Sequence, residues 1–422
     1  MWPARFIFAT GERSVKRANR VASLGVTERV RAIEYAIRDV IVYANQVAKT
    51  GKRIYYLNIG DPVAFDFDTP EHIKQALMEA VRKGENAYAP SEGLPELRQA
   101  ISHKEKKVNG VDVSSENVVV TSGISEGIQM VMAALVDPGD EVLLPGPTYP
   151  PYVSYVRFFG GRPVAYQTVE EKGWQPNIED MRRKISERTK GILIVNPGNP
   201  CGALYEEKTV KQIVDLAGEH DLPVLSDEIY DRIVYEKRFA STAALTNDVP
   251  VIGLNGFSKA YLMTGWRLGY VYFCDRKGRL EELKQGIEKE SRMRLCANTP
   301  VQKAGVTALN GSQDHIEDMV RKLRQRRDYA WKRMSEIGGV SCTKPEAAFY
   351  LFPRIHGIGS KWKTDLEYVI DLLRETGVLF VHGSGFDPVY GAGHIRSVIL
   401  PPIDILEQAF NELSWFMKSK AS

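Results

Sequence analysis

Residues 191–230 read GILIVNPGNPCGALYEEKTVKQIVDLAGEHDLPVLSDEIY and decide the fold of the central part of the chain. The apolar runs 191–195 and 223–225 are short, bounded by turn residues and typical of buried strands. Between them, residues 206–220 place Val210, Ile213, Val214 and Ala217 on one helical face. A strand, a helix and a second strand in this order predict a parallel β-α-β unit.

The same alternation extends to both sides of this segment. Further runs typical of buried strands are Asn117–Thr121, Glu141–Leu144, Val251–Leu254 and Leu268–Phe273. The sequence therefore predicts an α/β fold with a mostly parallel sheet of the seven-stranded type between helices. Ligands bind at the carboxyl ends of the strands in such sheets, so the residues that follow each run are the candidates for chemistry.

The two flanks of the chain have a different pattern. Residues 20–50 predict a mainly helical lead-in, and a Gly-Asp-Pro turn follows at 60–62. After residue 310 we expect a long charged helix, short strands and a closing helix, with the helix at His315–Glu336 and the strands at Val340–Thr343, Ala348–Phe352, Val378–Val381 and Ile395–Leu400. We predict a large domain over 66–310 and a small α+β domain built from 1–65 and 311–422.

Composition excludes several classes of function. The 422 residues contain 56 Lys and Arg against 53 Asp and Glu, and this balance favours neither nucleic acid nor a membrane surface as partner. No stretch approaches the roughly 18 apolar residues of a spanning helix. The start, MWPARFIFATGERSVKR, lacks a signal-peptide core, and Glu12 and the scarcity of serine disfavour an organellar presequence. We expect a cytoplasmic protein.

The cysteines suggest neither disulfides nor a metal. The four are scattered without a C-x-x-C pair, at Cys201, Cys274, Cys296 and Cys342. This spacing gives no thiolate zinc site and fits a reducing compartment. We expect no metal site.

A glycine-rich turn follows the run 117–121. Residues 122–127, SGISEG, lead into an amphipathic helix at Ile128–Leu135, and a helix N-terminus after a glycine turn binds anions. The same letters contain G-x-S-x-G, the pattern of a serine hydrolase with Ser125 as nucleophile. By order alone His382 or His394 could complete that triad, so both possibilities remain open at this point.

The other strand ends do not resemble a hydrolase. After 191–195 comes NPGNPCG, after 223–225 comes SDEIY, and after 251–254 come Lys259 and Arg267, eight residues apart. A strand-end carboxylate, a lysine, an arginine and an anion-binding turn at one sheet edge fit a phosphorylated pyridine aldehyde held as a Schiff base. The hydrolase alternative leaves Lys259, Asp227 and Arg267 unexplained.

Three motifs resemble those of the class I/II aminotransferases of fold type I, which use pyridoxal 5'-phosphate (PLP). They are S-D-E-I-Y at 226–230, N-P-G-N-P-x-G at 196–202 and S-K-x-x-x-x-x-G-W-R-x-G at 258–269. The resemblance extends from LNIGDP at 57–62 to VHG at 381–383 and HIR at 394–396. Within the group, LNIGDP, NPGNPCGALY and RLCANTPVQ are most similar to prokaryotic alanine aminotransferases.

The resemblance implies roles for the residues around the cofactor ring. Lys259 corresponds to the lysine that forms the Schiff base and moves the substrate proton. Asp227 corresponds to the carboxylate that pairs with the protonated pyridine nitrogen. Tyr230 and Asn199 would hydrogen-bond the 3'-oxygen, and Tyr149 would stack on the ring.

The resemblance also implies how phosphate and substrate are held. Arg267, the amides of Ile124 and Ser125, and the Ser125 hydroxyl would bind the phosphate, and Ser258 would add a bond. The remaining residues would serve the substrate or the neighbouring subunit: Arg396 clamps the α-carboxylate, Asn199 and Gly60 lie beside the substrate, and Tyr88 reaches the phosphate of a second subunit. A homodimer with shared active sites follows from this reading.

The sequence departs from the family pattern at three places. Cys201 stands where threonine is commoner, and Gly256 stands where some relatives have a phosphate-binding serine. A second arginine for an aspartate side chain has no secure equivalent, because Arg292 and Arg294 flank that position and Met293 occupies it. The missing second arginine weakens an aspartate specificity without excluding it, whereas Cys201 should keep the backbone role of threonine and Ser258 could take over the phosphate bond lost at Gly256.

The resemblance implies transamination between an L-amino acid and a 2-oxo acid by a ping-pong mechanism. The expected reaction is L-alanine with 2-oxoglutarate to give pyruvate and L-glutamate. Aspartate, or a broad specificity that includes aromatic or aminoadipate-type substrates, is the alternative, and lyase or cyclising chemistry remains open. A cofactor-binding regulator is disfavoured, because the residues before 57 leave little room for a DNA-binding module.

Overall fold

The computed structural model describes residues 25–33 and 35–420. Residues 1–24 lie outside the described residues, and with them the N-terminal stretch 1–17, the first part of the predicted lead-in and the corresponding part of the predicted segment 1–65. The rest of that lead-in is helical and consists of three helices, which are α1 (Glu28–Arg31), α2 (Ala36–Asp39) and α3 (Ile41–Ala48).

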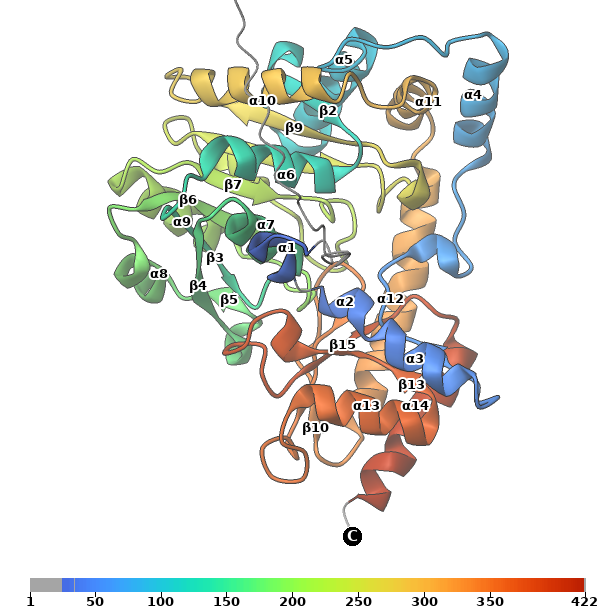
Figure 1. Cartoon of the computed structure of the whole chain (residues 1–422). Coiled ribbons are helices and arrows are strands. Elements are labelled where there is room, and N and C mark those ends of the chain that lie inside the picture. The colour runs from blue at the N-terminus through green and yellow to red at the C-terminus, as the bar shows by residue number, and fades with distance from the viewer. Residues whose placement is uncertain (1–24, 34, 421–422) are drawn as a thin grey trace, which may run out of the picture.

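A single eight-stranded sheet forms the centre of the molecule (Figure 1), with the strand order β2-β9-β8-β7-β6-β3-β4-β5. Pairs among β3, β4, β6, β7 and β8 are parallel, whereas β9 lies antiparallel between β2 and β8. The strands are β2 (Val118–Thr121), β3 (Glu141–Gly146), β4 (Arg162–Val169), β5 (Gln175–Pro176), β6 (Thr189–Val195), β7 (Val224–Asp227), β8 (Val251–Gly256) and β9 (Gly269–Cys274).

Helices cover both faces of this sheet, because successive apolar residues of each strand point to opposite sides. Leu193 of β6 faces a core shared with α6 (Ile124–Leu135), α7 (Pro150–Phe158) and α10 (Glu281–Met293). Ile192 and Ile194 face the other core, to which several helices contribute, among them α5 (Pro95–Lys104), α8 (Ile178–Lys184), α9 (Glu207–Glu219) and α11 (Thr299–Asn310). The prediction of an α/β fold with a mostly parallel sheet is confirmed, but the sheet has eight strands where the seven-stranded type was expected.

Two strands were absent from the sequence prediction. The residues of β4, RPVAYQTV, include a proline and three polar side chains, Arg162, Gln167 and Thr168, so they form no continuous apolar run. β5 has only two residues and pairs antiparallel with β4 at the sheet edge. Short or mixed edge strands have weak sequence signals, because one side of the strand has no partner to bury against it.

The second part of the molecule combines the N-terminal helices with the C-terminal third of the chain (Figure 1). β1 (Tyr55–Tyr56) pairs in parallel with β13 (Val378–Leu379), and Ala44 and Val47 of α3 pack against Leu373 and Leu379. The remaining elements of this part are α12 (Asp314–Ser335), β10 (Val340–Ser341), β11 (Tyr350–Leu351), β12 (Arg354–Ile355), α13 (Asp365–Thr376), β14 (Val381–His382), β15 (Ile395–Val398) and α14 (Ile403–Ser419). Helix α4 (Glu71–Arg82) instead packs against α11, near the large sheet (Figure 1). The domain limits at 65/66 and 310/311 stay a prediction.

None of the helices among residues 25–33 and 35–420 is long and apolar enough to cross a membrane. The four cysteines are free thiols. Within the same residues, no group of three or more His, Cys, Asp or Glu side chains is arranged to hold a metal ion.

Candidate active site

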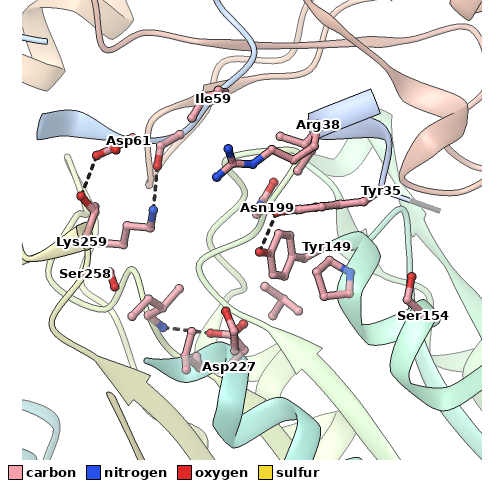
Figure 2. Close-up of a pocket in the computed structure, with 18 of the residues that line it drawn as sticks. Tyr35, Arg38, Ile59, Asp61, Tyr149, Ser154, Asn199, Asp227, Ser258 and Lys259 are labelled. Carbon is pink, nitrogen blue, oxygen red and sulfur yellow. Dashed lines mark hydrogen bonds between the residues drawn. The ribbon is translucent and has the colours of Figure 1, made fainter. Parts of the chain in front are cut away.

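A cavity of about 720 Å³ lies at the carboxyl ends of β6, β7 and β8, between the sheet and the second part of the molecule. It brings together every predicted site residue except Tyr88, namely Gly60, Ile124, Ser125, Tyr149, Asn199, Asp227, Tyr230, Ser258, Lys259, Arg267 and Arg396. Figure 2 shows side chains of the sheet wall facing those of the N-terminal segment across this space.

Asp227 ends β7, where its neighbours are Val195 of β6 and Leu254 of β8. The carboxylate is buried and accepts hydrogen bonds from the Tyr152 hydroxyl at 2.8 Å and the Ile229 amide at 3.1 Å. Burial raises the pKa of Asp227 to about 6, and these two donors and Lys259 oppose the rise. A buried carboxylate with no cation in direct contact is suited to a positively charged ring nitrogen.

Lys259 lies in the turn after β8 and extends into the cavity (Figure 2), where its Nζ donates a hydrogen bond to the Gly60 carbonyl at 2.7 Å. Burial lowers the pKa of Lys259 to about 8; Arg396 and Arg267 lower it further, and Asp61 and Asp227 act in the opposite direction. A lysine with a depressed pKa has a larger fraction of neutral amine at pH 7, which is the form that attacks an aldehyde.

Arg267 and the N-terminus of α6 form a cationic cradle. Gly123 precedes the helix with a φ of 79°, and a Cβ on this residue would collide with the Arg267 guanidinium. Arg267 Nη1 lies 3.5 Å from Ser258 Oγ, and Nη2 lies 3.5 Å from Ser125 Oγ. The first amides of a helix have no intrahelical acceptor, so a guanidinium, two hydroxyls and free amides converge here and suit a phosphate.

Arg396 is buried in β15, between the rings of Tyr350 and Phe386 at 4.6 and 4.9 Å. Its Nη1 donates to Asn199 Oδ1 at 2.9 Å and its Nη2 donates to the Asn58 carbonyl. Its Nε has no hydrogen-bond partner among the residues described. Arg396 lines the cavity, and a guanidinium whose plane is fixed by two rings and two acceptors is suited to a carboxylate.

Tyr350 lies between several of the predicted residues. Its hydroxyl lies 2.6 Å from that of Tyr230, and its ring covers Arg396. A Cβ on Gly60 would collide with the Tyr350 hydroxyl. The glycine expected to leave room for substrate therefore also leaves room for this tyrosine.

The N-terminal segment closes one side of the cavity. Tyr35, directly before α2, shares a hydrogen bond of 3.1 Å with Tyr149, and the two rings meet edge to face (Figure 2). Asn58 Nδ2 lies 3.4 Å from the Ile37 carbonyl. These contacts place α2 at the mouth of the site.

Several residues named from the sequence lie elsewhere. Tyr88 is 80% exposed and does not line the cavity. Arg294 donates to the Val120 carbonyl at 2.6 Å and lies 3.1 Å from Glu126, so it supports the sheet from behind the site. Met293 is exposed and Arg292 lies near Glu92. These positions provide no second arginine to the cavity from 292–294.

The serine hydrolase alternative finds no support in the geometry. Ser125 faces Arg267, whereas His394 Nε2 lies 3.1 Å from Glu170 and His382 Nδ1 lies 2.9 Å from Ser384. Neither histidine lines the cavity. Neither of these two histidines is therefore positioned to activate Ser125.

Sequence reasoning missed Tyr152, Tyr350, Tyr35 and Arg38, which touch or line the site. Tyr152 follows Tyr149 by three residues at the start of α7, and this spacing on one helical face was an available signal. Tyr350 lies in an apolar run and was indistinguishable from core residues. Tyr35 and Arg38 lie in a helical lead-in with no recognisable motif.

Comparisons with known proteins give the family. Residues 53–401 match the model of the family described as aminotransferase class I and II. The chain is 37% identical to the alanine aminotransferase of Mycobacterium tuberculosis over 95% of this chain and 94% of that protein, and 36% identical to the glutamate-pyruvate aminotransferase AlaA of Escherichia coli over 93% and 97%. The solved structure of an alanine aminotransferase from Pyrococcus furiosus is 52% identical, with a TM-score of 0.92 over 94% of this chain and all of that one.

The chain belongs to the class I and II aminotransferases, and the predicted enzyme class and fold type are confirmed. These enzymes use PLP as their cofactor. The residues present fit it: the cradle beside Gly123 matches the phosphate, the buried carboxylate of Asp227 matches the ring nitrogen, and the Lys259 amine matches the aldehyde.

Proposed function

We propose that this enzyme transfers the amino group between L-alanine and 2-oxoglutarate, giving pyruvate and L-glutamate. The observation that carries the proposal is that relatives similar over nearly their whole length are named alanine aminotransferase and glutamate-pyruvate aminotransferase. The likeness to the alanine aminotransferase structure from Pyrococcus furiosus supports it. The amino acid and the 2-oxo acid share one site and take turns in it.

We assign the proton transfers to Lys259. When bound, PLP supplies the aldehyde and a ring that stabilises negative charge at the substrate α-carbon. With PLP bound, the lysine amine would take the proton from that carbon and return it to the carbon of the former aldehyde, on the other side of the amino nitrogen. Its depressed pKa keeps the amine able to accept a proton near neutral pH.

The other residues of the sheet wall hold the cofactor. Asp227 keeps the ring nitrogen protonated, and the hydroxyl of Tyr152 fixes the carboxylate toward it. Tyr230 and Asn199 bind the ring oxygen, and Tyr149 stacks on the ring. Residues around the cradle, which are Ile124, Ser125, Ser258 and Arg267, bind the phosphate.

Arg396 binds the α-carboxylate of both substrates. Its burial between Tyr350 and Phe386 fixes the plane of the guanidinium before substrate arrives, and Asn199 holds one of its edges. This preorganisation lowers the cost of ordering the substrate. Gly60 provides the space beside the substrate.

We also propose a homodimer in which Tyr88 reaches the phosphate of the second subunit. Its support is the 80% exposure of a tyrosine at a position that the family pattern assigns to the neighbouring site. Met293 and Leu295 add exposed apolar surface. We place the enzyme in the cytoplasm, in keeping with its four free cysteines.

Mixing two inactive variants tests the dimer. If Tyr88 acts in the other subunit, hybrids of Tyr88→Ala and Lys259→Ala chains contain one site with neither defect. Activity should then return after the two variants are unfolded and refolded together, and light scattering should give twice the mass of one chain. A monomer, or no recovery in hybrids of confirmed composition, would contradict the proposal.

The reaction is tested first by absorption spectroscopy of the purified enzyme with PLP. Addition of L-alanine should remove the visible band of the lysine-bound cofactor and produce a near-ultraviolet band of the aminated cofactor. Pyruvate and 2-oxoglutarate should each reverse the change. A visible band that responds to L-aspartate but not to L-alanine would be consistent with an aminotransferase but would contradict L-alanine as its substrate.

A further inference from the structure

Four cationic side chains line the cavity, and three of them have partners there. Arg267 contacts Ser125, Ser258 and a main-chain carbonyl, Arg396 contacts Asn199 and Asn58, and Lys259 contacts the carbonyl of Gly60. The fourth cation is Arg38 of α2.

The Arg38 side chain makes no hydrogen bond or ion pair with any residue of the described part of the chain. The carboxylates of the cavity are used elsewhere: Asp61 accepts from Thr264 and from the Val63 amide, and Asp227 accepts from Tyr152. Asp39, next to Arg38, accepts from the Tyr35 amide. Figure 2 shows Arg38 extending from α2 into the cavity, toward the side where Lys259 lies.

The main chain at Arg38 is tied to Arg396 through one residue. The Asn58 side chain donates a hydrogen bond from Nδ2 to the Ile37 carbonyl at 3.4 Å. The main-chain carbonyl of Asn58 accepts a hydrogen bond from Arg396 Nη2. Ile37 is buried, and the hydrogen bond of Tyr35 to Tyr149 holds the other end of this short segment. Arg38 is therefore held at the substrate end of the cavity, on the same side as the guanidinium assigned to the α-carboxylate.

The negative groups of the reactants match these cations one by one. Arg267 is assigned to the phosphate of the cofactor, and Arg396 is assigned to the α-carboxylate of the substrate. L-Alanine and pyruvate have no further negative charge. L-Glutamate and 2-oxoglutarate have a second carboxylate. Arg38 is exposed at the mouth of the cavity, so water solvates its guanidinium, and a carboxylate that enters there can replace this water with a charge-assisted contact.

We propose that Arg38 binds the second carboxylate of dicarboxylic substrates and thereby gives this enzyme its glutamate and 2-oxoglutarate half-reaction. The proposal rests on the proposed function. Arg38 acts on binding alone and contributes nothing to the half-reaction with alanine and pyruvate.

The test compares Arg38→Gln, Arg38→Lys and the matched control Arg31→Gln in the enzyme loaded with PLP. Arg31 lies in the preceding helix, pairs with Glu28 and does not line the cavity. For Arg38→Gln we expect kcat/KM with glutamate and 2-oxoglutarate to fall roughly 10–100-fold, mainly through KM, because a charge-assisted bidentate contact is lost. With alanine and pyruvate it should stay within about twofold, Arg38→Lys should be intermediate and the control unchanged.

A binding measurement separates this inference from the reaction itself. Calorimetry should show that the wild-type enzyme binds glutarate more tightly than pentanoate, which has the same number of carbons and one carboxylate. Arg38→Gln should remove the preference for glutarate. If Arg38→Gln removes the glutarate preference but the wild-type enzyme does not use alanine, the proposed reaction is wrong and the proposed role of Arg38 is still supported. An equal loss with alanine and glutamate, or an unchanged glutarate preference, would overturn the inference.

Discussion

The two walls of the cavity are built differently. The sheet wall carries Asp227 at the end of β7, Lys259 in the turn after β8 and Arg267 directly before β9, and these neighbouring strands have a fixed register. The opposite wall comes from segments far apart in the chain: a short helix with Arg38, the loop at Gly60, a two-residue strand with Tyr350 and β15 with Arg396.

This difference separates two tasks. Strand ends in a sheet covered on both faces move little relative to one another, and they hold the groups assigned to the cofactor. The opposite wall is held by hydrogen bonds between loops and short helices, such as Tyr35 to Tyr149 and Asn58 to Ile37. We infer that changes in the sheet wall alter mainly the rate of chemistry, and changes in the opposite wall alter mainly substrate binding.

The largest effect is expected for Lys259→Ala. Removing the amine eliminates both the covalent link to the cofactor and the proton carrier, so kcat should fall by about four orders of magnitude or more. Stopped-flow absorption with L-alanine measures the loss. Lys277→Ala, on the exposed loop before α10, serves as control. Turnover at the wild-type rate in Lys259→Ala would show that the reaction does not require this lysine.

Arg396→Lys tests the opposite wall. A single ammonium cannot replace a planar guanidinium that spans Asn199, Asn58 and a substrate carboxylate, so KM for both alanine and glutamate should rise roughly 10–100-fold. The loss is common to both substrates, unlike that expected at Arg38. Steady-state kinetics measures it. A fall in kcat at unchanged KM would contradict the inference that this wall acts mainly in substrate binding.

The pKa of Lys259 predicts a pH dependence for cofactor capture. Only the neutral amine attacks the aldehyde, and burial lowers the pKa of this lysine to about 8. The rate at which the cofactor-free protein captures PLP should therefore rise about tenfold per pH unit below pH 8 and level off above it. The growth of visible absorbance records the rate. A rise that continues to pH 10 would indicate a lysine with its ordinary pKa.

The smallest effect is expected from a pair of substitutions that touch each other. In Gly60→Ala the new methyl group meets the Tyr350 hydroxyl and displaces a ring that covers Arg396, so KM should rise about tenfold or less. Tyr350→Phe removes that hydroxyl. The double variant Gly60→Ala with Tyr350→Phe should recover part of the loss, and additive effects in this double-mutant cycle would contradict the contact.

Sequence reasoning located the residues of the sheet wall better than those of the opposite wall. On the sheet wall the residues lie next to apolar runs, so strand prediction and motif spacing place Asp227 and Lys259 at one edge. On the opposite wall the position of a side chain depends on contacts between distant segments. Gly60 and Arg396 were found through a family resemblance, whereas Tyr350 and Arg38 have no local signal that distinguishes them from a core tyrosine and a solvated arginine.

The pairing of β1 with β13 has a consequence for how the enzyme is made. Tyr55 finds its strand partner only when Val378 has left the ribosome, and Arg396 follows later still. By then all the strands of the large sheet have been synthesised. The wall assigned to the cofactor is thus complete early in translation and the wall assigned to the substrate is the last to form, so a chain truncated before residue 378 lacks the means to choose an amino acid.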